Sequence, residues 1–286
     1  MPEILAVIVT YNALPWIDRC IGSLRESSLR PDIFVVDNCS ADGTAEYIAE
    51  HFPEVIFRPQ KENLGFGAAN NLGLRYALDN GYDFVYLMNQ DAWVKAETLE
   101  KLTAAYDKSY AVLSPLQTDA GGKEPDSNFE RKCGKFITKA PERARIVDVP
   151  FVMAAHWLVG RDAVEKVGGF SPAFKQYGED DNWIHRALYF NYKIGVVPCA
   201  VAVHDRAARP QTKERKMRLK CVSSAVRLSN PKGSYLLKEL LEPLHLLGMA
   251  VKNFSAVPLK SIPATVSRYR ELGDFRKASQ TPGAFL

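Results

Sequence analysis

The sequence lacks the features that mark membrane-spanning, secreted and metal-thiolate proteins. No run of about 18 apolar residues occurs, so no transmembrane helix is expected. The first residues carry neither a basic stretch nor a small-residue cleavage site, so no signal peptide is expected. Five cysteines are scattered without C-x-x-C spacing, which predicts reduced thiols rather than a zinc site or a disulfide framework. Together these absences predict a cytoplasmic protein.

An excess of charge of one sign is also missing from the chain as a whole. The 37 Lys and Arg nearly balance the 33 Asp and Glu, for a net charge of +4, so we expect no nucleic-acid partner. The chain has 286 residues, of which 47% are hydrophobic, and this is enough for a sizeable core. We therefore expect one large domain, or one domain with an appended tail.

Apolar runs alternate with amphipathic helical patterns through the first half of the chain. The run at 4–9 lacks the polar–apolar alternation of a half-exposed strand, which predicts a strand buried on both faces. A second buried strand is expected at 33–36, a short third strand at 55–58 and a fourth at 83–88. Helices are expected to follow them, at 14–27, up to 51, up to 78 and at 96–108, before a strand near Val112. Repeated strand–helix units with short loops predict parallel crossovers and an α/β fold with a mostly parallel sheet.

The pattern changes in the second half. Residues 117–145 are polar with little periodicity, and we expect them to form a surface excursion. Helices are expected at 161–167 and from Glu179 to about Phe190, whereas Pro198 makes the strand at 194–203 an edge strand or an irregular one. From residue 206 onward the chain is basic and helical.

Polar residues stand at the ends of the predicted strands, where an open parallel sheet binds its ligands. They are Thr10, Tyr11, Asn12, Asp37, Asn89 and Asp91. Helical crossovers bring these positions to one edge of the sheet. Asp37 can accept hydrogen bonds from a base or a ribose, but it can equally form a turn with Asn38 and Ser40, and both interpretations stay open.

The segment from Asn63 to Asn70 contains G-x-G and opens a helix, but it is no dinucleotide fingerprint. It follows the third strand rather than the first, and its sixth position is Asn70. This argues against an oxidoreductase. Two interpretations remain, a tight turn that needs small residues and a backbone that passes close to a nucleotide.

Acidic residues form two candidate sites. Asp91, at a strand end beside Asn89, can hold a hard divalent cation, because Mg²⁺ takes one or two carboxylates together with substrate phosphates. Glu179, Asp180 and Asp181 open a helix, where they can stabilise its dipole or supply a general base. Adjacent acids on a helix point in different directions, which argues against a glycosidase pair.

His204 follows the apolar run 201–203. A lone histidine after a strand can be structural or can bind a metal, and the pattern alone leaves both open.

Taken together, these segments resemble the family 2 glycosyltransferases, which are inverting enzymes with the GT-A fold. The rhamnosyltransferase-like bacterial members are the most similar. The matching segments occur in family order over about the first 205 residues: VIVTYN, VVDNCSADGT, ENLGFGAANNLG, YLMNQDAW, GRDAVEKVGGFSPAF and YGEDDNWIHRA. The resemblance implies a GT-A catalytic domain at 1–205, with a nucleotide-binding half at 1–115 and an acceptor and catalytic-base half at 146–205. A helical extension at 206–286 follows.

The resemblance also implies roles for individual residues. Asp180 matches the catalytic base, with Glu179 beside it, and Asp91 matches the last acid of the motif that holds Mg²⁺ or Mn²⁺. His204 matches a histidine near the metal or the diphosphate. The remaining matches imply nucleotide-sugar contacts by Thr10, Tyr11, Asn12, Asp37, Asn63, Gly65, Asn89 and Arg186. Asn89 replaces the first carboxylate of the metal motif.

The function implied is transfer of a sugar from a nucleoside-diphosphate sugar to a hydroxyl of a saccharide or lipid-linked acceptor, as in surface polysaccharide biosynthesis. The missing carboxylate keeps a nucleotide-sugar-binding protein without transferase activity as the alternative. The basic stretch 206–227 and the apolar-rich 236–251 are typical of peripheral contact with the inner face of a membrane. Packing on the catalytic domain, or in a homodimer, is the other interpretation.

Overall fold

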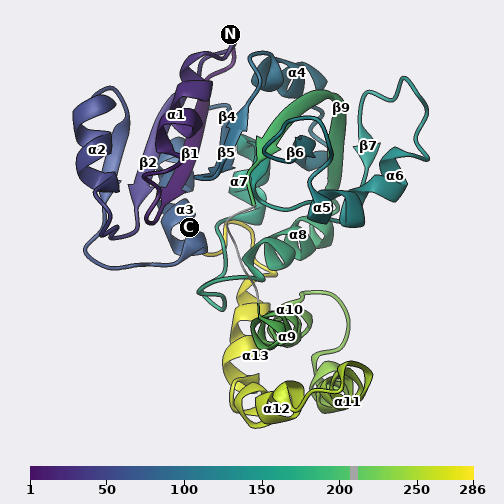
Figure 1. The fold of residues 1–286 in the computed structure, drawn as a ribbon. Coiled ribbons are helices and arrows are strands. Elements are labelled where there is room, and N and C mark those ends of the chain that lie inside the picture. Colours follow the sequence, from purple (N-terminus) through teal and green to yellow (C-terminus); the bar gives the residue numbers. More distant parts are fainter. Residues whose placement is uncertain (207–211) are drawn as a thin grey trace.

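The computed structural model describes residues 1–206 and 212–286 (Figure 1). Its described strands form a nine-stranded sheet in the order β3-β2-β1-β4-β8-β6-β9-β5, with β7 paired to β9. The strands are β1 (Ile4–Thr10), β2 (Asp32–Asp37), β3 (Ile56–Pro59), β4 (Phe84–Asn89), β5 (Ala92–Val94), β6 (Tyr110–Thr118), β7 (Val147–Asp148), β8 (His156–Gly160) and β9 (Lys193–His204).

Helices connect the strands of the sheet. They are α1 (Ile17–Arg25), α2 (Thr44–His51), α3 (Phe66–Asp79), α4 (Thr98–Ala105), α5 (Ser127–Phe129), the π-helical turn η1 (Glu130–Gly134), α6 (Lys135–Ile137), α7 (Arg161–Val167) and α8 (Glu179–Tyr189). The α/β class expected from the sequence is confirmed. The predicted helix at 14–27 is shorter than expected: residues 14–16, which include Pro15, form a turn before α1, and α1 ends at Arg25.

The first four strands pair in parallel, as the repeated strand–helix units predict, with β1 between β2 and β4. The second half of the sheet is mixed. Strand β8 lies antiparallel between β4 and β6, while β6 and β9 are parallel. Strand β9 is interior rather than an edge, and the pairing with β6 jumps from Val197 to Val201, so the predicted irregularity falls at Pro198.

Both faces of the sheet are covered by helices, which is why the β1 residues are buried without alternation. Leu5 and Val7 pack in one cluster with residues of α3, α7 and α8. Ile4, Ala6 and Ile8 pack in another with residues of α1, α2 and α4. Alternate side chains of a strand point to opposite faces, so a strand inside a three-layer fold must be apolar throughout.

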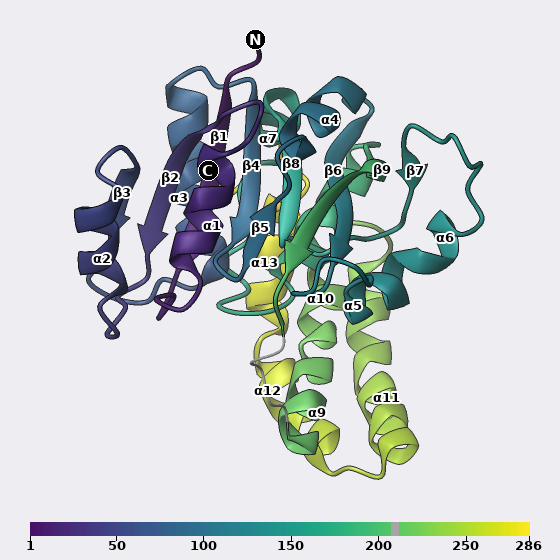
Figure 2. The ribbon, with the colours of Figure 1, turned by 45° about the horizontal axis from the view of Figure 1, so that its top comes forward.

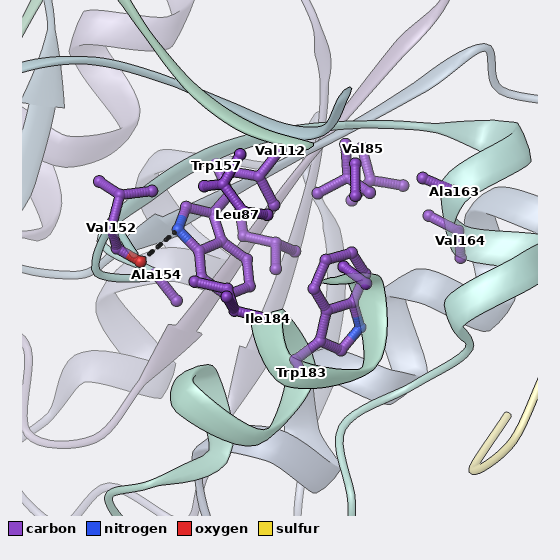
Figure 3. Packing of buried hydrophobic residues seen from close by; sticks show 14 of the residues in the cluster. Val85, Leu87, Val112, Val152, Ala154, Trp157, Ala163, Val164, Trp183 and Ile184 are labelled. Atoms are coloured by element: carbon purple, nitrogen blue, oxygen red, sulfur yellow. Dashed lines mark hydrogen bonds between the residues drawn. The ribbon is translucent and has the colours of Figure 1, made fainter. Parts of the chain in front are cut away.

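Helix α8 is fixed to the sheet by aromatic packing (Figure 3). The Trp183 and Trp157 rings lie 5.4 Å apart between centroids, and Ile184 packs in the same cluster. The Trp157 indole N–H donates to the Val152 carbonyl oxygen at 3.2 Å, and that of Trp183 to the Gly168 oxygen at 2.8 Å. This packing sets the position of the acidic residues at the start of α8.

The polar stretch 117–145 is more ordered than the sequence predicts. It contains the end of β6 and the consecutive turns α5, η1 and α6. Phe129 and Cys133 are buried in the main core. Most residues of 119–145 are exposed or half-buried, as a surface excursion requires, but the buried Phe129 and Cys133 anchor the segment to the core.

The chain after residue 212 forms a helical extension that projects from one end of the sheet (Figures 1 and 2). Its helices are α9 (Lys213–Cys221), α10 (Ser223–Ser229), α11 (Tyr235–Asn253), α12 (Val257–Ser267) and α13 (Tyr269–Ala278). The last residues return to the sheet unit, where the Gly169 N–H donates to the Ala284 oxygen at 2.9 Å. Among the described helices, none combines the length and apolarity needed to cross a bilayer.

Candidate active site

A cavity of about 1270 Å³ lies between the carboxyl ends of β1 and β4, the start of α8 and the helical extension. Eight of the predicted site residues line it: Tyr11, Asn63, Gly65, Asn89, Asp91, Glu179, Asp180 and His204. The cavity is therefore where the two acidic candidate sites meet. Thr10, Asn12, Asp37 and Arg186 do not line it.

Asp91 and His204 form a buried pair in the wall of the cavity. The antiparallel pairing of β5 with β9 puts Ala92 opposite His204, which brings Asp91 alongside it. The Asp91 Oδ1 lies 3.4 Å from the His204 Nε2, and the two residues are 2% and 1% exposed. The Asn89 amide nitrogen is also 3.4 Å from the His204 Nε2.

The donor set of this pair suits a divalent cation that completes its shell with other oxygens. In the described part of the chain no three His, Cys, Asp or Glu cluster as a metal cage. Mg²⁺ and Mn²⁺ accept a small number of protein ligands when phosphate oxygens and water supply the rest. The Nδ1 of His204 is buried without a hydrogen-bond partner, which is unusual for a histidine with only a structural role.

The acidic cluster at the start of α8 faces the cavity with two carboxyl groups. Gly178, with φ of 93°, precedes the helix, and Glu179 and Asp180 both line the cavity. Burial raises the pKa of Asp180, and the negative charge of Asp181 raises it further. Burial also raises the pKa of Glu179, whose Oε2 has no hydrogen-bond partner. Carboxyl groups with raised pKa values are better proton acceptors near neutral pH.

The turn at Gly65 borders the cavity and packs against the segment that precedes α8. Gly65 has φ of 85°, and a Cβ built on it would overlap the backbone carbonyl oxygen of Lys175. A Cβ on Gly67 would lie 2.9 Å from the Cβ of Phe170. Both sequence interpretations of the G-x-G segment therefore describe part of it: small residues are needed for close packing, and the turn borders the cavity.

Thr10, Asn12 and Asp37 form a hydrogen-bonded network behind the cavity wall. The Thr10 hydroxyl donates to the Asp37 Oδ1 at 2.8 Å, and the Ser40 N–H donates to its Oδ2 at 2.9 Å. The Ala41 N–H donates to the Asn12 side-chain oxygen at 2.9 Å. Asp37 is 2% exposed and forms the turn with Ser40 that was one of its two interpretations from the sequence. The network holds the adjacent Tyr11 and Asn38, which do line the cavity.

Arg186 does not line the cavity. It is fully buried, and its guanidinium donates to the carbonyl oxygens of Val167, Gly169 and Ala284. It thus fastens α8 to the turn after α7 and to the end of the chain. The geometry gives it a position in the packing and no access to a ligand in the cavity.

Sequence reasoning missed several residues of the site. The Tyr11 N–H donates to the Gln90 Oε1 at 2.7 Å, and the Gln90 amide donates back to the Tyr11 oxygen at 3.2 Å. This exchange joins the loops after β1 and β4. The far wall of the cavity comes from the helical extension and from a residue that precedes it. Four cations line it there: Arg206, Arg218, Lys260 and Arg268. Periodicity shows that such helices exist, but nothing local in the sequence shows that they fold back over the cavity.

Comparison with known proteins shows which family this chain resembles. The profile of the family described as "Glycosyl transferase family 2" matches residues 5–168, more than half of the chain. Over 238 residues the chain is 27% identical to the N-acetylglucosaminyl-diphospho-decaprenol L-rhamnosyltransferase of Mycobacterium tuberculosis. That alignment covers 72% of this chain and 78% of the relative.

Solved structures share the fold. The mannosyltransferase of Pyrobaculum calidifontis, in complex with GDP-Man and Mn²⁺, superposes with a TM-score of 0.62 at 19% identity, covering 96% of this chain and 84% of that one. Residues 1–349 of S. aureus TarS with UDP-GlcNAc give 0.57 at 18% identity, covering 98% and 82%. In a longer TarS structure this chain spans 55% of that protein. These likenesses confirm the GT-A fold expected from the sequence.

Proposed function

The chain belongs to glycosyl transferase family 2, and from this premise we propose that it moves a sugar from a nucleoside-diphosphate sugar to a hydroxyl of a saccharide or glycolipid, with inversion at the anomeric carbon. One observation carries the proposal. The buried Asp91–His204 pair and the Asp180 carboxyl line the same cavity. A group suited to a diphosphate-bound cation and a group suited to accept a proton are both needed for such a transfer.

The nucleotide side of the donor would lie against the loops that follow β1, β2 and β3. Tyr11, Asn38, Asn63 and Gly65 supply the cavity lining there. Asn38 is itself held by the Leu64 N–H, which donates to its side-chain oxygen at 3.3 Å. Thr10, Asn12 and Asp37 act from behind by fixing these loops, so their role is positioning.

Asp91 and His204 would hold the divalent cation, Mg²⁺ or Mn²⁺. When bound, such a cation neutralises negative charge on the departing diphosphate. The Mn²⁺ in the complex of the mannosyltransferase of similar fold supports this choice of cofactor. Asn89 contributes an amide at the position where a second carboxylate could stand, which leaves Asp91 as the charged ligand.

Asp180 would take the proton from the acceptor hydroxyl. The hydroxyl oxygen forms its bond to the anomeric carbon while the bond from that carbon to the diphosphate oxygen breaks, and a single displacement of this kind inverts the configuration. Burial, which raises the pKa of Asp180, strengthens it as a base. The raised pKa of Glu179 favours its protonated form, which reduces its repulsion of Asp180.

The acceptor we propose is a lipid-linked saccharide. Support comes from the M. tuberculosis relative, which is named as a rhamnosyltransferase of N-acetylglucosaminyl-diphospho-decaprenol, a lipid-linked sugar. The cations Arg218, Lys260 and Arg268 in the far wall of the cavity suit a phosphate-bearing acceptor.

The test begins with a screen of nucleotide sugars for thermal stabilisation in the presence of Mn²⁺ or Mg²⁺, because the right donor raises the melting temperature by ligand linkage. Transfer from that donor is then assayed with wild type, Asp180→Asn and the exposed control Asp79→Asn. We expect an inverted anomeric product and its loss only in Asp180→Asn. Donor binding without transfer or hydrolysis would instead support the binding-protein alternative, which Asn89 favours.

A further inference from the structure

Helix α11 exposes more large apolar side chains than it buries. Its outward face carries a row of eight large apolar side chains, here called the α11 stripe, each 40–97% exposed: Leu236, Leu237, Leu240, Leu241, Leu244, Leu247, Val251 and Phe254. Phe254 itself follows the last helical residue. The spacing of three or four residues keeps them on one side of the helix. Of the 14 large hydrophobic residues exposed in the described chain, ten lie between 236 and 266.

The inward face of the same helix buries Leu246 and Ala250 and is also held by polar contacts. Glu242 is 1% exposed and accepts hydrogen bonds from the Ser224 hydroxyl at 2.7 Å and from the Arg227 Nε at 2.8 Å. The Tyr269 hydroxyl donates to the Glu239 carbonyl oxygen at 2.8 Å. A buried, paired Glu242 fixes the rotation of α11, so the leucines cannot turn inward without leaving a buried charge unpaired.

Charge is segregated between the two parts of the chain. Residues 206–286 contain 16 Lys and Arg against five Asp and Glu, a net charge of +11. Residues 1–205 contain 21 against 28, a net charge of −7. The modest total of +4 hides this asymmetry. Exposed lysines stand close to the α11 stripe, with Lys252 on α11 and the Lys220 ammonium 2.9 Å from the Asn253 side-chain oxygen.

We propose that the α11 stripe docks the protein peripherally on an anionic lipid bilayer. An apolar stripe flanked by cations is the pattern of a helix that lies in the interface of an anionic membrane. A second copy of the chain is the less suitable occupant, because pairing two extensions of +11 brings like charges together. Phe254, 97% exposed at the turn between α11 and α12, is placed to insert at the tip.

Docking also has a consequence for the cavity. Helices α9 and α12 of the docked extension supply Arg218 and Lys260 to the cavity wall. The extension would therefore hold the cavity close to the lipid headgroups. This arrangement suits the lipid-linked acceptor of the proposed function, but docking itself requires neither donor nor catalysis.

Vesicle flotation of the full chain tests the proposal. Wild type is mixed with vesicles of phosphatidylcholine alone or with about 30% phosphatidylglycerol, beside Leu244→Glu, Lys252→Glu and the control Leu72→Glu, an exposed leucine of α3. We expect binding to the anionic vesicles, a fall on the order of 10-fold in the partition coefficient for Leu244→Glu, a smaller fall for Lys252→Glu, and no change for Leu72→Glu. Higher salt weakens the binding.

All three substituted side chains are exposed, so we expect the variants to fold, and their melting temperatures check this. Wild type that stays off anionic vesicles, or Leu244→Glu that binds them as well as wild type does, overturns the proposal. So does a dimer in sedimentation velocity that dissociates in Leu244→Glu while vesicles remain unbound. Because the assay contains no sugar nucleotide, its failure is distinct from a failure of the proposed transferase activity.

Discussion

The Asp91 carboxylate and the His204 imidazole, far apart in the sequence, lie 3.4 Å apart in the wall of the cavity that also contains Asp180. The relationship is created by strand pairing, because β5 begins immediately after Asp91 and aligns with the end of β9. A charged oxygen and an imidazole nitrogen are thereby presented to one ligand.

Removing either member of this pair is expected to weaken metal-dependent donor binding. In the presence of Mn²⁺, Asp91→Ala and His204→Ala should each raise the donor Kd by about 10- to 100-fold, since a charge-assisted contact contributes roughly 1.5–3 kcal/mol. Calorimetry measures this, with the exposed Asp79→Ala as control. In EDTA the variants and wild type should bind alike. Equal donor affinity in Mn²⁺ would remove both residues from the metal site.

The pH profile of transfer should report Asp180. Because its pKa is raised, the acidic limb of kcat/KM is expected well above the ordinary aspartate range of about 4. Asp181→Asn removes a neighbouring negative charge, which favours the ionised form of Asp180 and lowers its pKa. The limb should therefore move to lower pH in this variant. A limb that does not move would mean that another group titrates.

Loss of the Asp180 carboxylate should slow sugar transfer strongly. Asp180→Asn is expected to lower kcat by about 10²- to 10⁴-fold, while the Kd of the donor changes little. Single-turnover transfer and calorimetry separate the two effects. A variant that keeps most of its kcat would exclude Asp180 as the base.

Gly65 and Gly22 form a matched pair for testing the turn that borders the cavity. Gly65→Ala places a Cβ against the Lys175 carbonyl oxygen in a left-handed backbone, so it should destabilise the fold by more than about 1 kcal/mol and weaken donor binding. Gly22, inside α1, has no atom within 4 Å of its built Cβ. Gly22→Ala should stabilise the protein by up to about 1 kcal/mol. Thermal unfolding that ranks them otherwise contradicts the packing described.

Arg186→Met should act on stability alone. Its loss leaves buried carbonyl oxygens unpaired, at a cost of about 2–4 kcal/mol in the free energy of unfolding. The Kd of the donor for the folded fraction should stay at the wild-type value, as in the exposed control Arg75→Met. A selective rise in the Kd without loss of stability would return Arg186 to the nucleotide-sugar contacts.

Much of this arrangement follows from local sequence. The unbroken apolar runs of β1, β2 and β4 predict buried parallel strands, and their polar ends predict a ligand edge at Tyr11, Asn89 and Asp91. The three apolar residues 92–94 after Asp91 are too few to signal a strand, so the pairing of β5 with β9 could not be predicted. Long-range pairing also places β8 between β4 and β6.

The direction in which a side chain points also could not be predicted from the sequence. Asp37 and Arg186 stand in matching motifs, but burial and hydrogen bonding turn their polar groups into the protein. Asn38 and Gln90, each beside a residue singled out from the sequence, are the ones that line the cavity. Periodicity cannot distinguish neighbours at a strand end, because the turn that follows decides which of them faces the ligand.

A crystal structure with a nucleoside diphosphate and Mn²⁺ gives the most direct test of the site. An anomalous difference map should show a single Mn²⁺ peak bridging the diphosphate to Asp91 and His204, with the Asp180 carboxyl facing the same cavity. A cation held by other residues, or a nucleotide bound outside the cavity, would contradict the assignment.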